Sequence, residues 1–451
     1  MIDPVAFCSV SLGMCAAVAA ALPVVYYILK WLLAHPIPDI RVEIKEDEAN
    51  DVLDPSRPLV DPAVSKKGVV QCWDPSSMKS LGELPAMGRE EVVARIERSR
   101  RAQATWSKSS FNQRRLLLRT MLKYIVDNQE TIARVSARDS GKAKVDAAMG
   151  EIMVTCEKLV WTIANAEQYL VPERRKSGTL MPHKRVWVEW VPVGVVGAIV
   201  PWNYPFHNLF NPLIAAIFSG NGFVVKVSEY ASWSTRYYGR IIEECLKAAG
   251  APCDLVQIVT GFGETGHALV TGGINKLIFV GSPEIGGKVM EAAATTWHPT
   301  PVVLELGGKD PFIICDDYGI TDDLVQVAVR GVFIHMGQNC AGPERFFVYE
   351  RPEAALICTQ EIFGPIMCVV MVPKDSDAEV IRMVNSNDFA LGSCVWSGNQ
   401  KRARNIARQL DAGMSAINDL GRNAQAEAAR AARCPLTRHL PAAHSLQEGA
   451  V

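Results

Sequence analysis

The sequence shows no excess of charge of either sign. Its 47 Lys and Arg residues nearly balance 48 Asp and Glu residues, which leaves a net charge of −1 over 451 residues. Nucleic-acid-binding domains gather basic residues, so this balance argues against a nucleic-acid partner. The hydrophobic and charged fractions, 49% and 21%, are those of an ordinary globular protein. The length allows two or three domains with a large core.

The sequence also lacks the cysteine spacings of metal sites and disulfide frameworks. Its twelve cysteines are scattered, none forms a CxxC pair, and no Cys/His spacing fits zinc. Scattered cysteines are typical of a reducing compartment. We therefore expect neither a structural metal site nor a disulfide scaffold.

Charge is absent from one long stretch near the N-terminus. Residues 4–29 (PVAFCSVSLGMCAAVAAALPVVYYIL) contain no charged side chain, and a helix of this length can cross the hydrocarbon core of a bilayer. No basic segment precedes the run, and the run is longer than the apolar core of a typical signal peptide. We therefore expect an uncleaved transmembrane anchor over residues 4–33; a cleaved signal peptide is the alternative.

The flanks of this run indicate an orientation. Lys30 and Arg41 follow it, whereas Asp3 precedes it, and the cytoplasmic flanks of membrane spans are enriched in Lys and Arg. We expect a single-pass membrane protein of the endomembrane or secretory pathway whose main body is cytosolic.

The rest of the chain divides by composition. Residues 34–63 are rich in proline and charge and read as a linker. Farther on, apolar β-runs such as 223–229 alternate with helical patterns, which predicts an α/β fold with a parallel sheet and helices on both faces. Residues 422–451, rich in Ala and Arg and poor in β-branched residues, are expected to be a poorly ordered tail.

Polar residues follow one predicted strand directly. VVKVSEY ends in Lys226, Ser228 and Glu229, at the edge where open α/β sheets bind ligands. A carboxylate there can accept hydrogen bonds from ribose hydroxyls and would repel a 2′-phosphate, so Glu229 favours NAD over NADP. The alternative is a pair of ordinary solvated charges at a strand end.

Two glycine-rich turns also follow predicted strands, GFGETG (261–266) and FVGSPEIGG (279–287). Backbone N–H groups at the start of a helix can receive a phosphate, and the Ser282 hydroxyl could add a contact. The alternative for Ser282 is a simple helix N-cap.

Two further residues are candidates for catalysis. Glu305 lies in the apolar run VVLELGGKDPFII, where burial would raise its pKa and suit it to act as a general base; pairing with the N–H groups of the next two glycines is the alternative. Asn203 lies between two prolines in VPWNYPF and could hold its amide donor in place, or could simply form a turn.

Cys340 lies in FIHMGQNCAGPER. Most free cysteines are packing residues, so the residues around it leave three alternatives: a buried filler, a disulfide partner or a nucleophile.

Taken together and in order, these motifs resemble the NAD(P)-dependent aldehyde dehydrogenase superfamily. The similar stretches are VPWNYP, VVKVSE, GFG, FVGSPEIG, LELGGKDP, GQNCAGPER and EIFGP, between about residues 60 and 421. The resemblance implies a Rossmann-type NAD-binding domain at 64–305 and a second α/β catalytic domain at 306–421. It also implies protruding oligomerisation strands at about 179–194.

The resemblance further implies oxidation of an aldehyde to a carboxylic acid, with NAD as the hydride acceptor. Cys340 would form a thiohemiacetal and then a thioester, Asn203 and the Cys340 N–H would bind the oxyanion, and Glu305 would activate water. The cofactor contacts that it implies are Trp202, Lys226, Ser228, Glu229, Gly261, Gly263, Gly281, Ser282, Leu306, Glu361 and Phe363.

Two departures from the family pattern lead to a second hypothesis. Only 21 positions separate Cys340 from Glu361, where the family has several more elements, so we expect a shortened catalytic domain with an incompletely paired sheet. After residue 421 no PFGG-type loop or final strand follows, which argues against the homo-oligomer that the family implies. The alternative function is therefore an impaired or inactive homologue that at most binds nucleotide. If the anchor exists, long-chain or lipid-derived aldehydes are the expected substrates.

Overall fold

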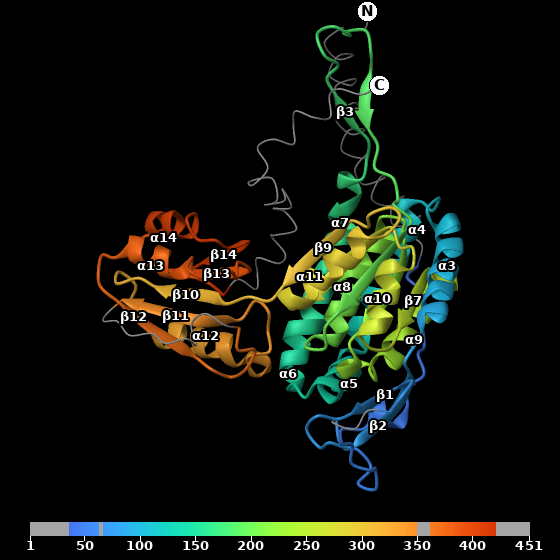
Figure 1. The fold of residues 1–451 in the computed structure, drawn as a ribbon, viewed down its shortest axis with the longest axis horizontal. Coiled ribbons are helices and arrows are strands. Elements are labelled where there is room, and N and C mark those ends of the chain that lie inside the picture. Colours follow the sequence, from blue (N-terminus) through green and yellow to red (C-terminus); the bar gives the residue numbers. More distant parts are fainter. Residues whose placement is uncertain (1–35, 63–65, 350–360, 421–451) are drawn as a thin grey trace, which may run out of the picture. The chain divides into compact units, whose positions relative to one another are not determined.

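The computed structural model describes residues 36–62, 66–349 and 361–420 (Figure 1). The expected anchor at 4–33 and the expected tail at 422–451 lie outside these residues. Within the described ranges, no helix combines the length and apolar character needed to cross a membrane. The elements below belong to one compact unit that begins at Ile40.

The first sheet has five parallel strands in the order β7-β6-β5-β8-β9. Their bounds are β5 Val195–Val200, β6 Gly222–Val227, β7 Val256–Val259, β8 Lys276–Gly281 and β9 Val302–Leu306. Strand β6 is buried at every position, as expected for a parallel strand covered on both faces. The predicted α/β fold with a parallel sheet is confirmed.

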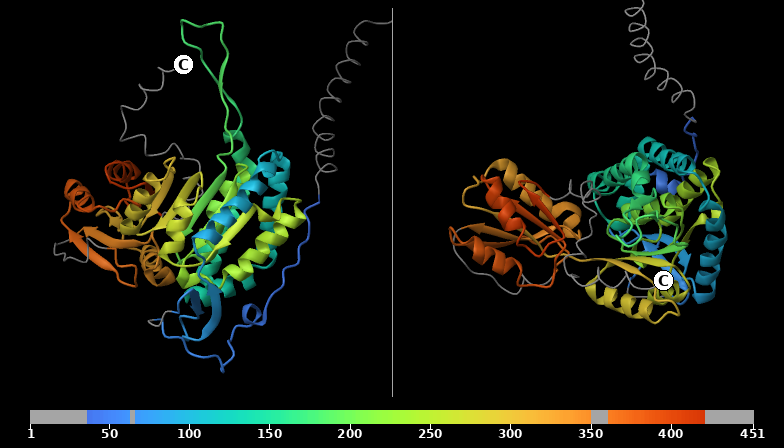
Figure 2. Two further views of the ribbon diagram at one scale, coloured as in Figure 1. Left: turned by 45° about the vertical axis from the view of Figure 1, so that its right-hand side comes forward. Right: turned by 90° about the horizontal axis from the view of Figure 1, so that it is seen from above.

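Helices pack on both faces of this sheet (Figures 1 and 2). On one face, α8 (Pro205–Phe218) and α9 (Thr235–Ala248) pack on the strands, and α4 (Phe111–Asp127), α5 (Gln129–Ser140) and α7 (Val154–Asn165) pack on these helices within the same core. The other packs on α3 (Arg89–Trp106), α10 (Gly263–Thr271) and α11 (Pro283–Ala294). Alternate residues of each strand enter the two cores: Val196 and Phe223 face the first set, whereas Val195 and Val224 face the second.

Local sequence explains several helix ends. Ser110 and Gln113 form a reciprocal capping box at the start of α4. Gly141 ends α5 with a φ of 74°, a conformation that glycine adopts at little cost. Between α6 (Lys144–Ala147) and α7, residues Ala148–Met153 form a π-helical turn.

Smaller elements precede and interrupt the first sheet. Within the expected linker, α2 (Glu46–Ala49) lies against α5, where Arg138 donates to the carbonyl oxygens of Asn50 and Asp51. Strands β1 (Val69–Trp73) and β2 (Ser80–Pro85) form an antiparallel hairpin. Strands β3 (Glu173–Arg175) and β4 (Val186–Val188) form a second antiparallel pair, with the exposed apolar side chains Leu180, Trp187 and Trp190 around it.

The second sheet is also parallel, in the order β12-β11-β10-β13-β14. Its strands are β10 Asp310–Ile314, β11 Pro343–Tyr349, β12 Cys368–Val372, β13 Gly392–Trp396 and β14 Met414–Ile417, and its helices are α12 Asp322–Phe333, α13 Asp377–Val384 and α14 Gln400–Ala407. Strand β11 pairs with β10 on one side and β12 on the other. The expected break in sheet pairing across the shortened interval is therefore absent from the described strands.

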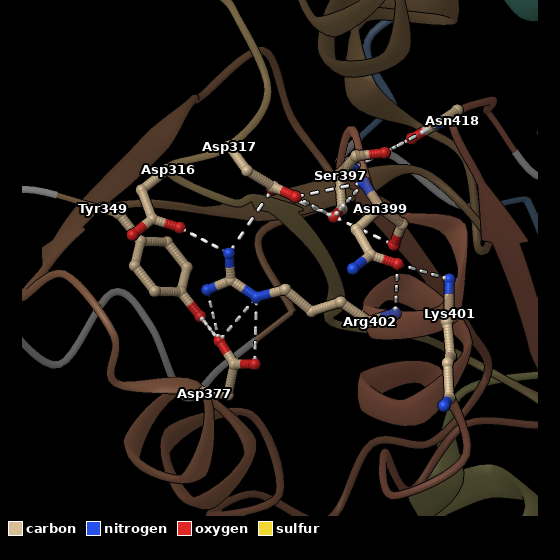
Figure 3. A network of polar contacts seen from close by, with 9 residues as sticks. All are labelled: Asp316, Asp317, Tyr349, Asp377, Ser397, Asn399, Lys401, Arg402 and Asn418. Atoms are coloured by element: carbon tan, nitrogen blue, oxygen red, sulfur yellow. Dashed lines mark hydrogen bonds and ion pairs between the residues drawn. The ribbon is translucent and has the colours of Figure 1, made fainter.

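A polar network closes the carboxyl edge of this second sheet (Figure 3). Arg402 on α14 binds Asp377 at the start of α13, with Nη2 2.6 Å from Oδ1, and Asp316 just after β10, at 2.5 Å. Tyr349 at the end of β11 donates to the same Asp377 carboxylate, at 2.8 Å. One guanidinium thus ties two helices to two strand ends.

Candidate active site

The parallel strands of the first sheet bring the predicted cofactor residues to one edge. Because all five strands run the same way, the residues that follow them share the carboxyl edge of the sheet. These residues are Trp202 and Asn203 after β5, Ser228 and Glu229 after β6, Gly261 after β7, Ser282 after β8, and Leu306 at the end of β9.

Cys340 and Glu305 interact with each other. Cys340 is a free thiol, and its side chain and the Glu305 carboxylate each influence the pKa of the other. Burial raises the pKa of Glu305, and burial together with the Glu305 charge raises the pKa of Cys340 well above its usual range. Glu305 is therefore the group placed to accept the proton of the Cys340 thiol.

Asn203 lies beside the loop that carries Cys340. Its side chain is 2% exposed, and its Nδ2 donates to the Gln338 carbonyl oxygen at 3.1 Å. Its Oδ1 accepts from Asn208 Nδ2 at 3.2 Å, which fixes the orientation of the amide. One N–H of the amide remains available for another acceptor.

Glycines allow three motifs to meet here. A Cβ added at Gly308 would lie 2.5 Å from the Cys340 carbonyl oxygen, and one at Gly307 would collide with the Glu361 carboxylate. Gly337, with a φ of 74°, packs on the Gly364 carbonyl. The segments LELGG, GQNC and EIFGP therefore converge in spite of the short interval between the last two.

Glu361 and Phe363 lie in this convergence. The Phe363 ring meets the Trp202 ring edge-on, with centroids 5.9 Å apart. Glu361 accepts a hydrogen bond from the Gly308 N–H, and burial, followed by the Glu344 charge, raises its pKa to about 7. The Gly308 N–H thus serves Glu361, whereas the sequence alternative had both glycine N–H groups serving Glu305. The Glu361 Oε1 atom is buried without a partner.

The other predicted cofactor residues lie at the carboxyl ends of strands β6 to β9. Lys226 is buried and pairs with Glu229 Oε2 at 3.0 Å, and Ser228 accepts from Tyr230 N. Gly281 ends β8, and Ser282 precedes α11 as its N-cap without using its hydroxyl as a cap acceptor. Gly261 has a φ of 146°, Gly263 begins α10, and Leu306 packs against Gly286. No cluster of three potential metal ligands occurs among the residues that the structure describes.

A cavity of about 500 Å³ opens next to this site. Trp202, Met336 and Gln338 line it on the side of the Cys340 loop, and Trp73 and Tyr230 line it elsewhere. Neither Cys340 nor Glu305 is among its lining residues, so we do not assign it to the aldehyde.

The sequence analysis missed a buried ion pair beneath Asn203. Lys142 Nζ and Glu151 Oε1 are 2.5 Å apart, and both side chains are fully buried. The sequence shows the two charges within a helical region, on either side of the segment AKVDAAMG, which itself contains Lys144 and Asp146. Charged residues are rarely buried unless they are paired, but nothing in the sequence indicates that these two are buried or in contact.

Comparison with known proteins agrees with this geometry. The profile of the aldehyde dehydrogenase family matches residues 63–356 and 349–429. An aldehyde dehydrogenase-like protein of Saccharomyces cerevisiae is 32% identical, over 78% of this chain and 68% of its own length. One of Schizosaccharomyces pombe is 36% identical, over 74% of this chain and 63% of its own length. The chain thus spans about two thirds of these curated relatives.

A solved structure shares the fold. The NAD+ complex of an aldehyde dehydrogenase from Bacillus cereus superposes with a TM-score of 0.71 at 24% identity, covering 78% of this chain and 85% of that one. The profile match extends over most of the sequence, and the Saccharomyces relative is similar along more than three quarters of it. The chain belongs to the aldehyde dehydrogenase family.

Proposed function

We propose that this chain oxidises an aldehyde to the carboxylic acid with NAD as the hydride acceptor. The observation that carries the proposal is that the Glu305 carboxylate interacts with the Cys340 thiol, while the Asn203 amide binds the loop that carries Cys340, at Gln338. A nucleophile, a base that interacts with it and a neutral donor beside it are the groups that acyl chemistry through a thiol requires.

The residues suggest the following order of events. Glu305 accepts the Cys340 proton, and the thiolate attacks the aldehyde carbonyl to give a thiohemiacetal. The free N–H of Asn203 and the Cys340 backbone N–H donate to the oxyanion. Bound NAD supplies a hydride acceptor at this stage, so that a thioester remains on Cys340. Glu305 then gives the proton that it took from Cys340 to solvent, and its ionised carboxylate takes a proton from water as the hydroxyl attacks the thioester. The acid is released, and the leaving Cys340 thiolate recovers its proton from Glu305.

The residues at the sheet edge fit a dinucleotide. The unpartnered Glu361 Oε1 can accept a hydrogen bond from a sugar hydroxyl, and the free amides at the start of α11 can receive a phosphate. Glu229, next to Lys226, would repel a 2′-phosphate, which supports NAD over NADP. Glu229→Gln should therefore narrow the difference in Kd between the two cofactors; an unchanged ratio would contradict this assignment.

The experiment that tests the function is an NADH assay with the full chain, NAD and a panel of aldehydes. NADH formation that disappears in Cys340→Ala, with NAD binding retained, supports the proposal. The second candidate, a nucleotide-binding homologue without turnover, is favoured by the short interval between Cys340 and Glu361. It predicts NAD binding and no acid product with any aldehyde.

Residues 4–29 support a membrane location through their lack of charge. We propose that they anchor the chain with its main body in the cytosol, and that long-chain aldehydes reach the site from the bilayer. The full chain should then stay with membranes after alkaline washing, whereas a chain without residues 1–40 should not. Preference for short soluble aldehydes would contradict the substrate part.

Although the sequence after residue 421 lacks the motifs of the family's final strand, we also propose that the chain forms a homo-oligomer through β3 and β4, because this pair carries exposed apolar side chains. The exposed fractions of Leu180, Trp187 and Trp190 are 91%, 57% and 51%, and apolar groups of this size are usually covered by a partner. Trp187→Ser should lower the mass measured by sedimentation. If the unsubstituted chain sediments as a monomer, the proposal is wrong.

A further inference from the structure

A buried ion pair lies beneath the loop that carries Asn203. Lys142 follows Gly141, the residue that ends α5, and its side chain is fully buried, as is that of Glu151. The two charged groups are 2.5 Å apart. Replacement of such a pair by apolar residues often leaves stability unchanged or improves it, so the pair calls for a role other than stability.

Both partners bind the backbone around Asn203. Lys142 Nζ donates to the Asn203 carbonyl oxygen at 2.6 Å and lies 4.2 Å from the centre of the Tyr204 ring. Glu151 Oε2 accepts from the backbone nitrogens of Phe206, at 2.7 Å, and His207, at 3.2 Å. These are first-turn N–H groups of α8, which have no partner within the helix.

The backbone conformation that places Glu151 at this position is unusual. It lies in the π-helical turn Ala148–Met153, a rare conformation that is found mostly at functional sites. Beside it, a Cβ at Gly150 would lie 2.7 Å from the Tyr204 ring. The Ser136 hydroxyl donates to the other oxygen of Glu151, so each carboxylate oxygen has a partner.

We infer that the Lys142–Glu151 pair positions Asn203 as the oxyanion donor. One charge holds the main-chain carbonyl of Asn203, and the other holds the helix that begins two residues later. The side-chain amide is thereby directed at the Cys340 loop, where it already meets the Gln338 carbonyl. The inference rests on the proposed function, and it assigns Lys142 and Glu151 as positioning residues, since neither needs to touch the aldehyde.

Such a role has a defined kinetic signature. A donor displaced by about 1 Å can cost on the order of 100-fold in rate, while the binding of NAD and of the ground-state aldehyde is little affected. The loss of rate should arise from the displacement of Asn203. Once Asn203 is removed, neutralising the pair should therefore cost little more.

The test is a double-mutant cycle. Lys142→Met combined with Glu151→Gln neutralises both charges without leaving one buried alone, and the cycle compares this pair variant, Asn203→Ala and their combination. We expect kcat to fall about 10- to 100-fold in the pair variant, KM to change by less than about twofold, and the combined variant to match Asn203→Ala. Hydrogen exchange of the Phe206 and His207 amides should be faster in the pair variant.

Controls separate this inference from the proposed function. Arg402→Met is the first control. Arg402 belongs to the polar network of the second sheet (Figure 3), so its loss should lower stability without changing kcat. An inactive wild-type chain would mean that the proposed function fails, and with it this role. An active wild type with an unchanged kcat in the pair variant, or with losses that add to those of Asn203→Ala, would overturn the positioning role alone.

Discussion

The side-chain amide of Asn203 donates to the Gln338 carbonyl oxygen at 3.1 Å. This contact joins the end of β5 to the loop that carries Cys340, two elements far apart in sequence. It places a neutral donor next to the nucleophile before any substrate binds, and donors aimed in advance at developing charge stabilise transition states most effectively.

Asn203→Ala should lower kcat by about 100- to 1000-fold, as expected for the loss of one oxyanion donor. The Kd for NAD should not change, because Asn203 is expected to contact the reacting carbonyl rather than the cofactor. Steady-state kinetics and calorimetry with NAD measure the two quantities. A kcat within threefold of the wild type would argue that the oxyanion is bound elsewhere.

Gly308→Ala should reduce activity by displacing the backbone of the nucleophile, Cys340. The added Cβ would lie 2.5 Å from the Cys340 carbonyl oxygen and 2.6 Å from Asp310 Oδ1, so the Cys340 loop must move. We expect at least a tenfold loss of kcat. We also expect a lower Tm, since overpacking typically lowers the free energy of unfolding by about 1–3 kcal/mol. Gly287→Ala in α11 is the matched control, because no atom lies within 4 Å of its added Cβ. Equal effects in the two variants would contradict the explanation.

Much of the first sheet was predictable from sequence. The run FVVKV is buried on both faces, and such runs, with helices between them, indicate a parallel sheet. The second sheet was less predictable. Only 21 positions separate Cys340 from Glu361, and this interval does not indicate that β11 and β12 pair directly, because strand pairing depends on tertiary packing that no local pattern encodes.

The residues of the candidate site likewise divide into those that the sequence indicates and those that it does not. Residues within recognisable motifs, such as Cys340, Glu305 and Asn203, could be proposed before the fold was known. The Lys142–Glu151 pair could not, since it depends on a π-helical turn for which the sequence carries no clear signature. Likewise, the contact of Glu361 with Gly308 replaces the pairing of Glu305 with glycine N–H groups that local spacing allowed.

Glu305→Gln should remove the general base without removing NAD binding. Burial raises the pKa of Glu305, and only the ionised form can take a proton, so wild-type activity should rise as the pH increases through that pKa. The variant should be about 100- to 10,000-fold slower and should lack this rise. Stopped-flow pH profiles of NADH formation measure both. A variant that keeps the wild-type profile would assign the base to another group.

Glu361→Gln should stabilise the cofactor-free protein at alkaline pH. The pKa of Glu361 is raised from 4.5 to about 7 by burial and by Glu344, so the folded state holds this proton more tightly than the unfolded state. Its stabilising contribution is complete below the unfolded pKa and is lost as the pH rises through about 7. The variant has no charge to bury at this position. Its free energy of unfolding should therefore exceed that of the wild type by roughly 1 kcal/mol at about pH 8.

At about pH 5 the two proteins should melt alike, because Glu361 is then protonated in the folded state. Melting curves at both pH values check this, with the exposed Glu291→Gln in α11 as a control that should show no such difference. A Tm increase of the same size at both pH values would point to packing rather than to charge.

Arg402→Met should destabilise the second sheet, most strongly near neutral pH. Hydrogen bonding to Arg402 lowers the pKa of Asp377 and of Asp316, so these carboxylates contribute stability above their unfolded pKa of about 4. That contribution is lost as the pH falls through their lowered pKa values. We expect a loss of about 1–3 kcal/mol in the free energy of unfolding at neutral pH, since the Arg402 side chain is only 20% exposed and its guanidinium serves several carboxylates (Figure 3).

The difference between Arg402→Met and the wild type should shrink as the medium becomes acidic, because protonated carboxyls no longer need the guanidinium. Urea unfolding at several pH values measures it. Arg382→Met is the matched control: Arg382 pairs with Glu379 on the surface of α13, where their side chains are 68% and 44% exposed, and exposed pairs contribute about 0–1 kcal/mol. If both variants unfold at the same urea concentration, the network does not hold α13 and α14 to the sheet, and packing of their apolar faces alone must do so.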